Sequence, residues 1–232
     1  MPRREPIIFI VSGPSGSGKS TLVQKILEMP DTMLSVSCTT RKPRPAEAPG
    51  KWYNFVSEEE FQRMADKGEF LEHFQVFGKN WYGTPWKNWQ EAKQKGLDLV
   101  LEIDVQGARE VQQGKLREYA VSIFILPPSR EELEHRIRAR SANSEDDIQR
   151  RLKQAKTEIG ALAEYYDYFI VNDDIERAGA KIQEIVRRER ARTFEERRVE
   201  RMGAGAMALA EQRRKRLESD SQAQMILQSF GG

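Results

Sequence analysis

Apolar residues in this chain gather in short runs separated by longer, more polar segments. Runs of about four to eight apolar residues bounded by turn residues predict strands buried in a parallel sheet. Several of the intervening segments open with helix-capping signals such as Ser-x-x-Glu. The alternation of strands with helices predicts an α/β class with a doubly wound parallel core sheet. We assign the core strands to residues 7–11, 97–104, 120–126 and 168–171.

Residues 35–90 interrupt this alternation with a block rich in extended runs. A loop containing three prolines and Gly50 separates its first two strands. Thr84 is placed to cap the next helix, with Pro85 at the first helical position. We interpret the block as a mixed, β-rich lobe inserted into the core. Its predicted strands are residues 34–37, 52–56 and 70–77.

The second half of the chain is mainly helical in its predicted pattern. Capping signals predict helices over residues 129–140 and 144–163. Beyond Arg190 the sequence becomes rich in Arg and Glu, and a basic run occupies residues 213–216. We expect residues 191–232 to form a basic, partly helical extension that contributes little to the core.

Composition limits the classes of protein that this chain can represent. Its 38 Lys and Arg nearly balance 36 Asp and Glu, which argues against a dedicated nucleic-acid surface. The single cysteine, Cys38, excludes an intramolecular disulfide and suits a reducing compartment. No apolar run approaches the roughly 18 residues of a membrane helix. We therefore expect a soluble, cytoplasmic protein without nucleic-acid or membrane partners, and its oligomeric state stays open.

The first predicted strand leads directly into the phosphate-binding pattern G-x-x-x-x-G-K-[ST]. Glycines let the backbone approach a phosphate, Lys19 supplies a positive charge, and the Ser20 hydroxyl is placed to bind Mg²⁺. A helix that opens at Lys19 adds its positive dipole end. The pattern predicts a nucleoside triphosphate site, and the absence of an N-K-x-D motif argues against a GTPase. The site residues are Gly13, Pro14, Ser15, Gly16, Ser17, Gly18, Lys19, Ser20 and Thr21.

Six further segments follow this loop in a fixed order. They are SCTTRKPR (37–44), YNF (53–55), FLE (70–72), WYGT (81–84), EIDVQG (102–107) and VNDD (171–174). With the loop they make seven motifs in the order seen in guanylate kinases. The chain therefore resembles a bacterial-type member of this P-loop nucleoside monophosphate kinase family over about residues 5–190.

The resemblance implies an activity and a division of the chain. The activity is Mg²⁺-dependent transfer of the ATP γ-phosphoryl group to GMP, which gives ADP and GDP in purine nucleotide metabolism. The family's fold implies a P-loop NTPase-like domain over residues 1–190. Within it we expect a GMP-binding lobe at about 35–90 and a helical ATP lid at about 137–155, with 191–232 as the extension.

The resemblance also implies how the GMP phosphate is held. Arginine can grip phosphate oxygens through two N–H groups, and tyrosine hydroxyls donate hydrogen bonds without adding charge. Taken singly, the arginines could be solvated loop charges and the tyrosines strand packing. The order of the motifs favours the binding role for Arg41, Arg44, Tyr53 and Tyr82.

Guanine recognition is implied for a second group of residues. The Glu72 carboxylate can accept hydrogen bonds from the N1–H and the 2-amino group of guanine, a pair that adenine lacks. Ser37 and Thr84 match accessory base contacts, with Asp104 close by, although β-propensity and helix capping also account for the first two.

Catalysis in this family is mostly positioning and charge neutralisation. The resemblance assigns the neutralising charges to Lys19 and the lid arginines Arg136, Arg140 and Arg151, and it places Asn172 near adenine. Each arginine could instead lie on a solvated helix face, and Asn172 could simply be a turn residue.

At the predicted metal site, Glu102 stands where many family members carry aspartate. Alternation along a strand would put Glu102 and Asp104 on the same face. Either carboxylate could support Mg²⁺, and we favour Glu102 together with the Ser20 hydroxyl.

Two alternatives to a guanylate kinase remain at this point. The chain could be a non-catalytic guanylate-kinase-like protein-interaction module, but such modules have degraded phosphate loops, and this loop is intact. It could also be a related kinase with a different phosphate acceptor.

Overall fold

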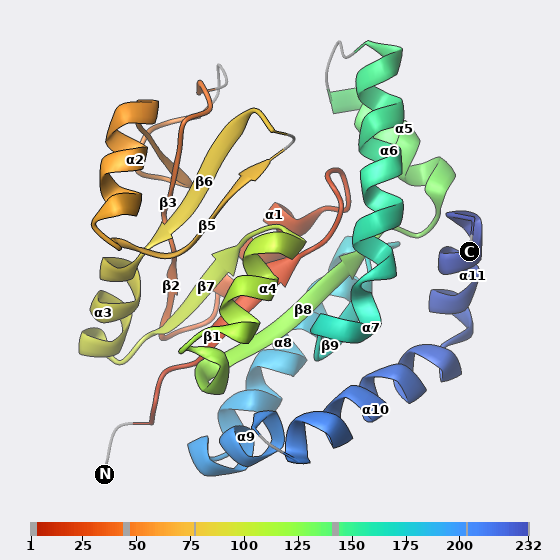
Figure 1. Cartoon of the computed structure of the whole chain (residues 1–232). Helices are drawn as coiled ribbons and strands as arrows, with labels where there is room; N and C mark the ends of the chain where they lie inside the picture. Colours follow the sequence, from red (N-terminus) through yellow and green to blue (C-terminus); the bar gives the residue numbers. More distant parts are fainter. Residues whose placement is uncertain (1–3, 44–46, 77, 141–143, 203, 232) are drawn as a thin grey trace.

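The computed structural model describes residues 4–43, 47–76, 78–140, 144–202 and 204–231. Its core is a five-stranded sheet in the order β2-β7-β1-β8-β9, and every pair of neighbouring strands is parallel. The predicted doubly wound α/β core is confirmed (Figure 1). The strands are β1 (Ile8–Ser12), β2 (Thr32–Leu34), β7 (Asp98–Glu102), β8 (Ala120–Leu126) and β9 (Tyr168–Val171).

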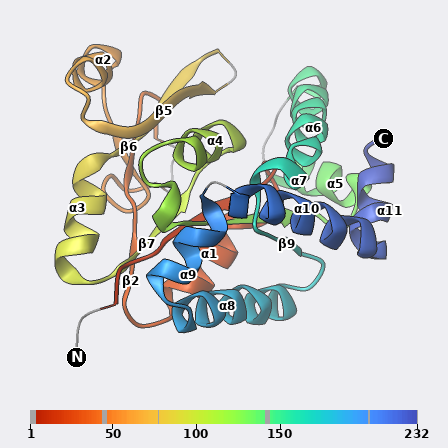
Figure 2. The same cartoon turned by 60° about the horizontal axis from the view of Figure 1, so that its bottom comes forward.

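Helices cover both faces of this sheet, as Figure 2 shows. On one face, α1 (Lys19–Leu27) and α8 (Ile175–Ala191) bury their apolar residues against β1 and β8. On the other, α4 (Val105–Gln113) packs against the sheet, with the short helix η1 (Arg117–Tyr119) after it. All residues of β8 are buried, which explains why this strand is a continuous apolar run in the sequence.

The inserted lobe is also confirmed as a separate, mixed four-stranded sheet in the order β4-β3-β6-β5. Strands β3 and β4 are parallel, whereas β6 is antiparallel to both β3 and β5. Helix α2 begins after Ser57, whose side chain accepts from the Glu60 backbone N–H as the capping signal predicts. The lobe comprises β3 (Ser37–Thr39), β4 (Tyr53–Phe55), α2 (Glu58–Asp66), β5 (Phe70–Val76) and β6 (Asn80–Pro85), followed by α3 (Trp86–Lys95).

Two local predictions about helix starts are wrong. Thr84 does not cap α3, because it lies buried within β6 and the helix begins one residue later than predicted, at Trp86. Asp104 does not continue β7, which ends at Glu102; instead its side chain accepts hydrogen bonds from the backbone of Gln106 and Gly107 and caps α4. An Asp before a run of helix-forming residues favours the cap over two further strand residues.

The two predicted lid helices are present as α5 (Arg130–Arg140) and α6 (Glu145–Gly160). The second ends earlier than predicted, because the chain turns at Ala161 into the short helix α7 (Leu162–Tyr165). Capping by Ser129 and Ser144 is as predicted, since each side chain accepts a backbone N–H three residues later.

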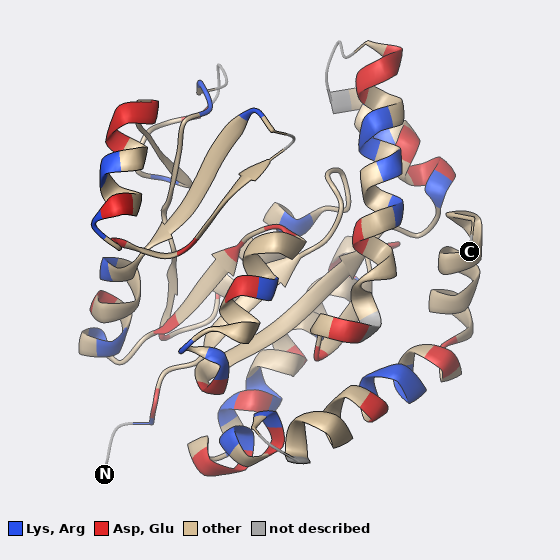
Figure 3. Ribbon diagram, viewed as in Figure 1, with Lys and Arg blue, Asp and Glu red and all other residues tan. Residues whose placement is uncertain are grey.

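The C-terminal extension is helical as predicted, but our expectation that it contributes little to the core is wrong. It forms α9 (Phe194–Arg201), α10 (Ala204–Ser219) and α11 (Ser221–Ser229), which wrap around one side of the domain (Figure 1). Leu217, Ile226 and Phe230 join the same apolar cluster as the core strands. Figure 3 shows the basic run on α10.

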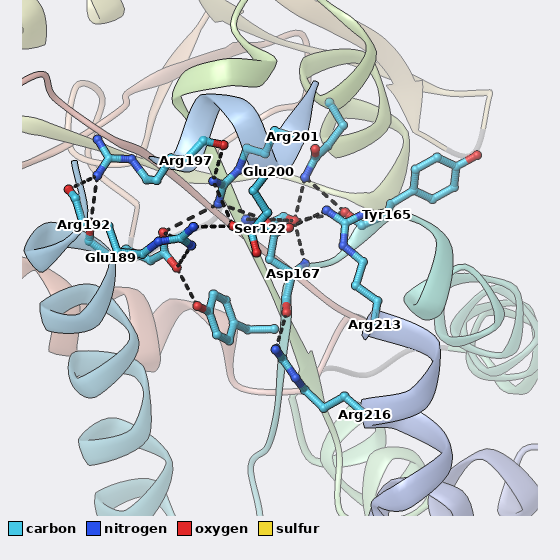
Figure 4. Close-up of polar contacts among 12 residues, drawn as sticks. Ser122, Tyr165, Asp167, Glu189, Arg192, Arg197, Glu200, Arg201, Arg213 and Arg216 are labelled. Carbon is cyan, nitrogen blue, oxygen red and sulfur yellow. Dashed lines mark hydrogen bonds and ion pairs between the residues drawn. The ribbon is translucent and has the colours of Figure 1, made fainter. Parts of the chain in front are cut away.

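Part of that basic run turns inward onto Asp167, a fully buried residue between α7 and β9. Arg213 pairs with the Asp167 carboxylate, Arg201 lies 3.7 Å from it, and the Ser122 backbone N–H donates to it at 2.9 Å (Figure 4). Burial opposes ionisation of Asp167, yet Arg201 and Arg213 hold its pKa below its usual value. The extension therefore supplies the counter-charges of a buried carboxylate in the core.

We expect Arg213→Ala to destabilise the fold by about 1–3 kcal/mol, because it leaves Asp167 with one distant arginine. The matched control is Arg214→Ala, since Arg214 is 63% exposed and pairs only with Glu211 among the described residues, whereas Arg213 is 11% exposed. Urea unfolding of both variants measures the difference. Equal stabilities would show that the Asp167 contact contributes nothing.

By the same reasoning, truncation after Arg190 should produce an unstable or insoluble chain.

None of the helices in the described part of the chain is long and apolar enough to span a membrane.

Candidate active site

The phosphate loop joins β1 to α1 and depends on backbone conformations that favour glycine. Gly16 and Gly18 have φ of 96° and 90°, in the region that L side chains rarely adopt. A Cβ at Gly18 would also lie 2.1 Å from the side-chain nitrogen of Asn172. That nitrogen donates to the Ser17 carbonyl at 2.7 Å, so Asn172 ties the loop to the end of β9. The glycine spacing is therefore required by the loop's own packing.

A cavity of about 450 Å³ opens where the loop, the inserted lobe and helix α6 meet. It lies at the carboxyl ends of the core strands, where open α/β sheets bind ligands. Most residues predicted from the sequence line it, although they come from distant segments of the chain. They are Gly13, Ser15, Gly16, Gly18, Lys19, Ser20, Ser37, Arg41, Tyr53, Glu72, Tyr82, Glu102, Asp104 and Arg151.

Lys19 and Ser20 open helix α1 on the floor of this cavity. The Lys19 ammonium donates to the carbonyls of Gly13 and Pro14 at 2.6 and 2.9 Å, which holds it over the loop. The Ser20 hydroxyl donates to Glu102 Oε1 at 2.8 Å. A hydroxyl and a carboxylate therefore meet directly beside the phosphate loop, whereas Asp104 is occupied with capping α4.

Glu72 lies deep on the other side of the cavity and is only 2% exposed. The pairing of β5 with β6 shifts register between Phe70 and Glu72. Among the described residues, no donor reaches Glu72 Oε2, a buried acceptor. Burial raises the Glu72 pKa to about 8, and Asp104 and Glu110 add to the effect while the Thr84 hydroxyl opposes it. The described residues therefore leave one acceptor oxygen of this buried carboxyl without a hydrogen-bond donor.

The close approach of α4 to Glu72 requires Gly107. A Cβ at that position would lie 2.8 Å from Glu72 Oε2 and 2.5 Å from the Phe74 ring. Ser37 and Thr84 lie nearby with their hydroxyl oxygens 3.4 Å apart, both buried. The sequence motif contained Gly107, but nothing in the sequence alone assigned it a role.

Arg41 lines the cavity, and its guanidinium lies among aromatic rings of the inserted lobe. Its Cζ lies 5.5 Å from the ring centres of both Tyr53 and Phe55, and its Nε donates to the Tyr82 hydroxyl at 3.2 Å. Burial raises the pKa of Tyr53, so its hydroxyl stays protonated as a donor. The structure thus brings together three of the four residues predicted for phosphate binding, and Arg44 lies outside the described residues.

The lid arginines differ in position. Arg151 lines the cavity and donates to the Ser15 side chain at 3.2 Å, which links α6 to the phosphate loop. Arg136 does not line it; its guanidinium contacts Glu132 at 2.7 Å and the Asn172 carbonyl at 3.3 Å. The side chain of Arg140 lies outside the described part of the chain.

Several cavity residues were missed by the sequence reasoning, among them three polar side chains that are hydrogen-bonded. Gln154 and Glu158 face the cavity from α6, and the Gln154 amide donates to Glu158 at 2.7 Å. Burial raises the Glu158 pKa to about 7, an effect that Lys19 opposes. The third is Glu47, which contacts Arg41. The spacing of three and then four residues between Arg151, Gln154 and Glu158, which places them on one helix face, was a signal that could have found two of them.

The fold and the loop geometry define a P-loop nucleotide-binding protein. Comparison with known proteins narrows this class. The family model described as guanylate kinase matches residues 4–189. The chain is 47% identical over 193 residues to a guanylate kinase of Geobacter metallireducens, covering 83% of this chain and 93% of the relative. It is also 47% identical over 188 residues to a guanylate kinase of Escherichia coli K12, covering 80% and 89%.

A solved structure agrees with these sequence relatives. The crystal structure of guanylate kinase from Anaplasma phagocytophilum superposes with a TM-score of 0.70 at 42% identity, covering 84% of this chain and 91% of that one. The chain belongs to the guanylate kinase family.

Proposed function

We propose that this chain transfers the γ-phosphoryl group of ATP to GMP, giving ADP and GDP. Membership of the guanylate kinase family supports this activity, and no feature favours a non-catalytic interaction module. One observation supports guanine as the base of the acceptor. The buried Glu72 Oε2 has no hydrogen-bond donor among the described residues, and Glu72 lines the same cavity as the intact phosphate loop.

The proposed mechanism places the two substrates on opposite sides of the cavity. The GMP base lies against Glu72, Ser37 and Thr84, and its phosphate lies against Arg41, Tyr53 and Tyr82, with Arg44 as a further predicted contact. The triphosphate of ATP lies in the loop at residues 13–21.

Charge neutralisation is the main contribution of the protein's side chains to the transfer. Lys19 holds the β and γ phosphates, and Arg151 adds a positive charge from the lid next to Ser15. We assign Arg136 and Arg140 to the closed lid as in the sequence prediction. Closure of the lobe and lid would exclude water, which limits hydrolysis of ATP.

Mg²⁺ is the cofactor that the family implies. The adjacent Ser20 hydroxyl and Glu102 carboxylate are hard oxygen donors and fit it, because Mg²⁺ in kinase sites is held by one or two protein oxygens, waters and substrate phosphates. No cluster of three or more acidic, His or Cys side chains occurs among the described residues, so the substrate would complete the site. When bound, Mg²⁺ would neutralise the phosphate oxygens.

The test is release of ADP from ATP in the presence of GMP, AMP, CMP or UMP, or with no acceptor. We expect turnover with GMP and only background rates otherwise. Equal background rates in every arm would support an interaction module, and preference for another nucleotide would identify a different acceptor. A cytoplasmic location and a role in purine nucleotide metabolism belong to the same proposal.

A further inference from the structure

Glu47 makes two polar contacts with Arg41. Its two carboxylate oxygens accept hydrogen bonds from the two terminal nitrogens of the guanidinium at 2.8 and 2.9 Å. Both side chains are largely shielded, at 16% exposed for Arg41 and 22% for Glu47. Glu47 also lines the nucleotide cavity. A forked, charge-assisted pair therefore lies at the position proposed for the acceptor phosphate.

The contacts of Arg41 divide its guanidinium into two edges. The end-on edge, formed by Nη1 and Nη2, is engaged by Glu47, and Nη1 also donates to the Lys42 carbonyl at 2.8 Å. The side edge is formed by Nε and the second Nη2 hydrogen. Nε donates to the Tyr82 hydroxyl, which accepts through oxygen and keeps its own hydrogen for a further partner.

This division determines where a phosphate can bind without displacing Glu47. An oxygen placed beside the side edge can accept from Nη2 and from the Tyr82 hydroxyl. The Tyr53 and Phe55 rings flank the same guanidinium, so its plane is also fixed. Without the carboxylate, a long Arg side chain would have to lose its rotamer freedom when the phosphate binds.

We propose that Glu47 is a positioning residue that holds Arg41 by its end-on edge and turns the side edge toward the phosphate of the acceptor nucleotide. This inference rests on the proposed role of Arg41 in GMP binding. Glu47 acts through Arg41 and does not touch the substrate.

The experiment measures dissociation constants of GMP and of guanosine by calorimetry for the full chain and its Glu47→Gln variant. Gln keeps the size of the side chain but removes the charge and one acceptor. We expect GMP to bind about five- to tenfold more weakly, whereas guanosine, which has no phosphate, should bind within about twofold of the unmodified chain. The control is Glu58→Gln, an exposed carboxylate of the same lobe, which should change neither constant.

A second pair of variants separates this inference from the proposed function. Arg41→Lys should also weaken GMP, and the double variant Arg41→Lys/Glu47→Gln should be no weaker than Arg41→Lys alone, because Glu47 acts through the forked guanidinium. If Arg41→Lys leaves GMP binding unchanged, the phosphate site itself is misassigned.

The remaining outcomes concern Glu47 alone. If Arg41→Lys weakens GMP but Glu47→Gln does not, only the positioning role is overturned. Tighter binding of GMP by Glu47→Gln would overturn it too, because it would show that the carboxylate competes with the phosphate. Equal weakening of GMP and guanosine would indicate general damage to the lobe. Thermal unfolding of each variant verifies that the compared proteins are folded.

Discussion

Lys19→Ala is expected to reduce kcat by at least a hundred- to a thousandfold, approximately the loss seen when one preorganised donor is removed from a transition state. The ammonium is held over the loop by two backbone carbonyls, so its charge is aimed at the position of the phosphates before they bind. The side chain is not part of either apolar cluster that covers the core sheet. Its removal should therefore affect the chemistry much more than the stability.

The measurement is steady-state phosphoryl transfer with saturating ATP and GMP, alongside thermal unfolding. Lys25→Ala is the matched control, since Lys25 lies on the same helix but contacts only Glu28 and Glu176 among the described carboxylates, at 3.9 and 3.4 Å. If the alanine variant is unstable, Lys19→Met replaces it in the measurement, because methionine keeps an unbranched side chain without the charge. A kcat within tenfold of the unmodified chain in a folded Lys19 variant would refute the catalytic role of the loop.

Four of the five core strands could be predicted because each is a local signal, whereas the short edge strand β2 (Thr32–Leu34) was not assigned to the core. Strand β8 is buried on both faces, and a strand in that environment must be apolar at every position. The phosphate loop could be predicted for a related reason, because Gly16 and Gly18 occupy conformations that few other residues adopt. In both cases the constraint lies within a few neighbouring residues.

The extension could not be predicted, because its constraints are long-range. A run of arginines normally indicates a solvated face, and the sequence does not reveal that Arg213 meets Asp167, 46 positions earlier. The apolar residues Leu217 and Ile226 likewise pack against residues that are distant in the sequence and come together only in the folded core. Glu47 was missed for a different reason: it lies only six positions after Arg41, but no pattern in the sequence indicates which side chain its carboxylate contacts.

The boundary between β7 and α4 shows a smaller limit of the same kind. In the sequence, Asp104 is compatible both with the end of a strand beside an active site and with a helix cap. In the structure it is a cap, because its side chain accepts hydrogen bonds from the backbone N–H groups of Gln106 and Gly107. Outside the phosphate loop, the residue-level roles in the site depended on the family resemblance and not on local pattern. They remain predictions that the variants described here can test.

Glu72→Gln is expected to lower kcat/KM for GMP by one to two orders of magnitude. An ionised carboxylate can accept from both N1–H and the 2-amino group of guanine, whereas the amide presents one donor to a donor. A hydrogen bond to a charged group contributes about 1.5–3 kcal/mol, and about 1.4 kcal/mol corresponds to a tenfold change. AMP offers no such pair of donors, so its low kcat/KM should hardly change and the preference for guanine should shrink.

The burial of Glu72 adds a pH dependence that identifies this residue more specifically. Because its pKa is raised to about 8 and guanine binds the ionised form, GMP binding must remove a proton at neutral pH. The affinity for GMP should therefore rise between about pH 6 and 8 and level off above. Ionisation of the GMP phosphate, with a pKa of about 6, contributes below pH 7 in every variant. Glu72→Gln should lose the part of the rise that lies above pH 7, while the control Glu58→Gln, at an exposed carboxylate of the same lobe that does not contribute to the Glu72 pKa, should retain the full profile. If the GMP-to-AMP ratio of kcat/KM and the rise above pH 7 both survive in Glu72→Gln, this carboxylate does not recognise the base.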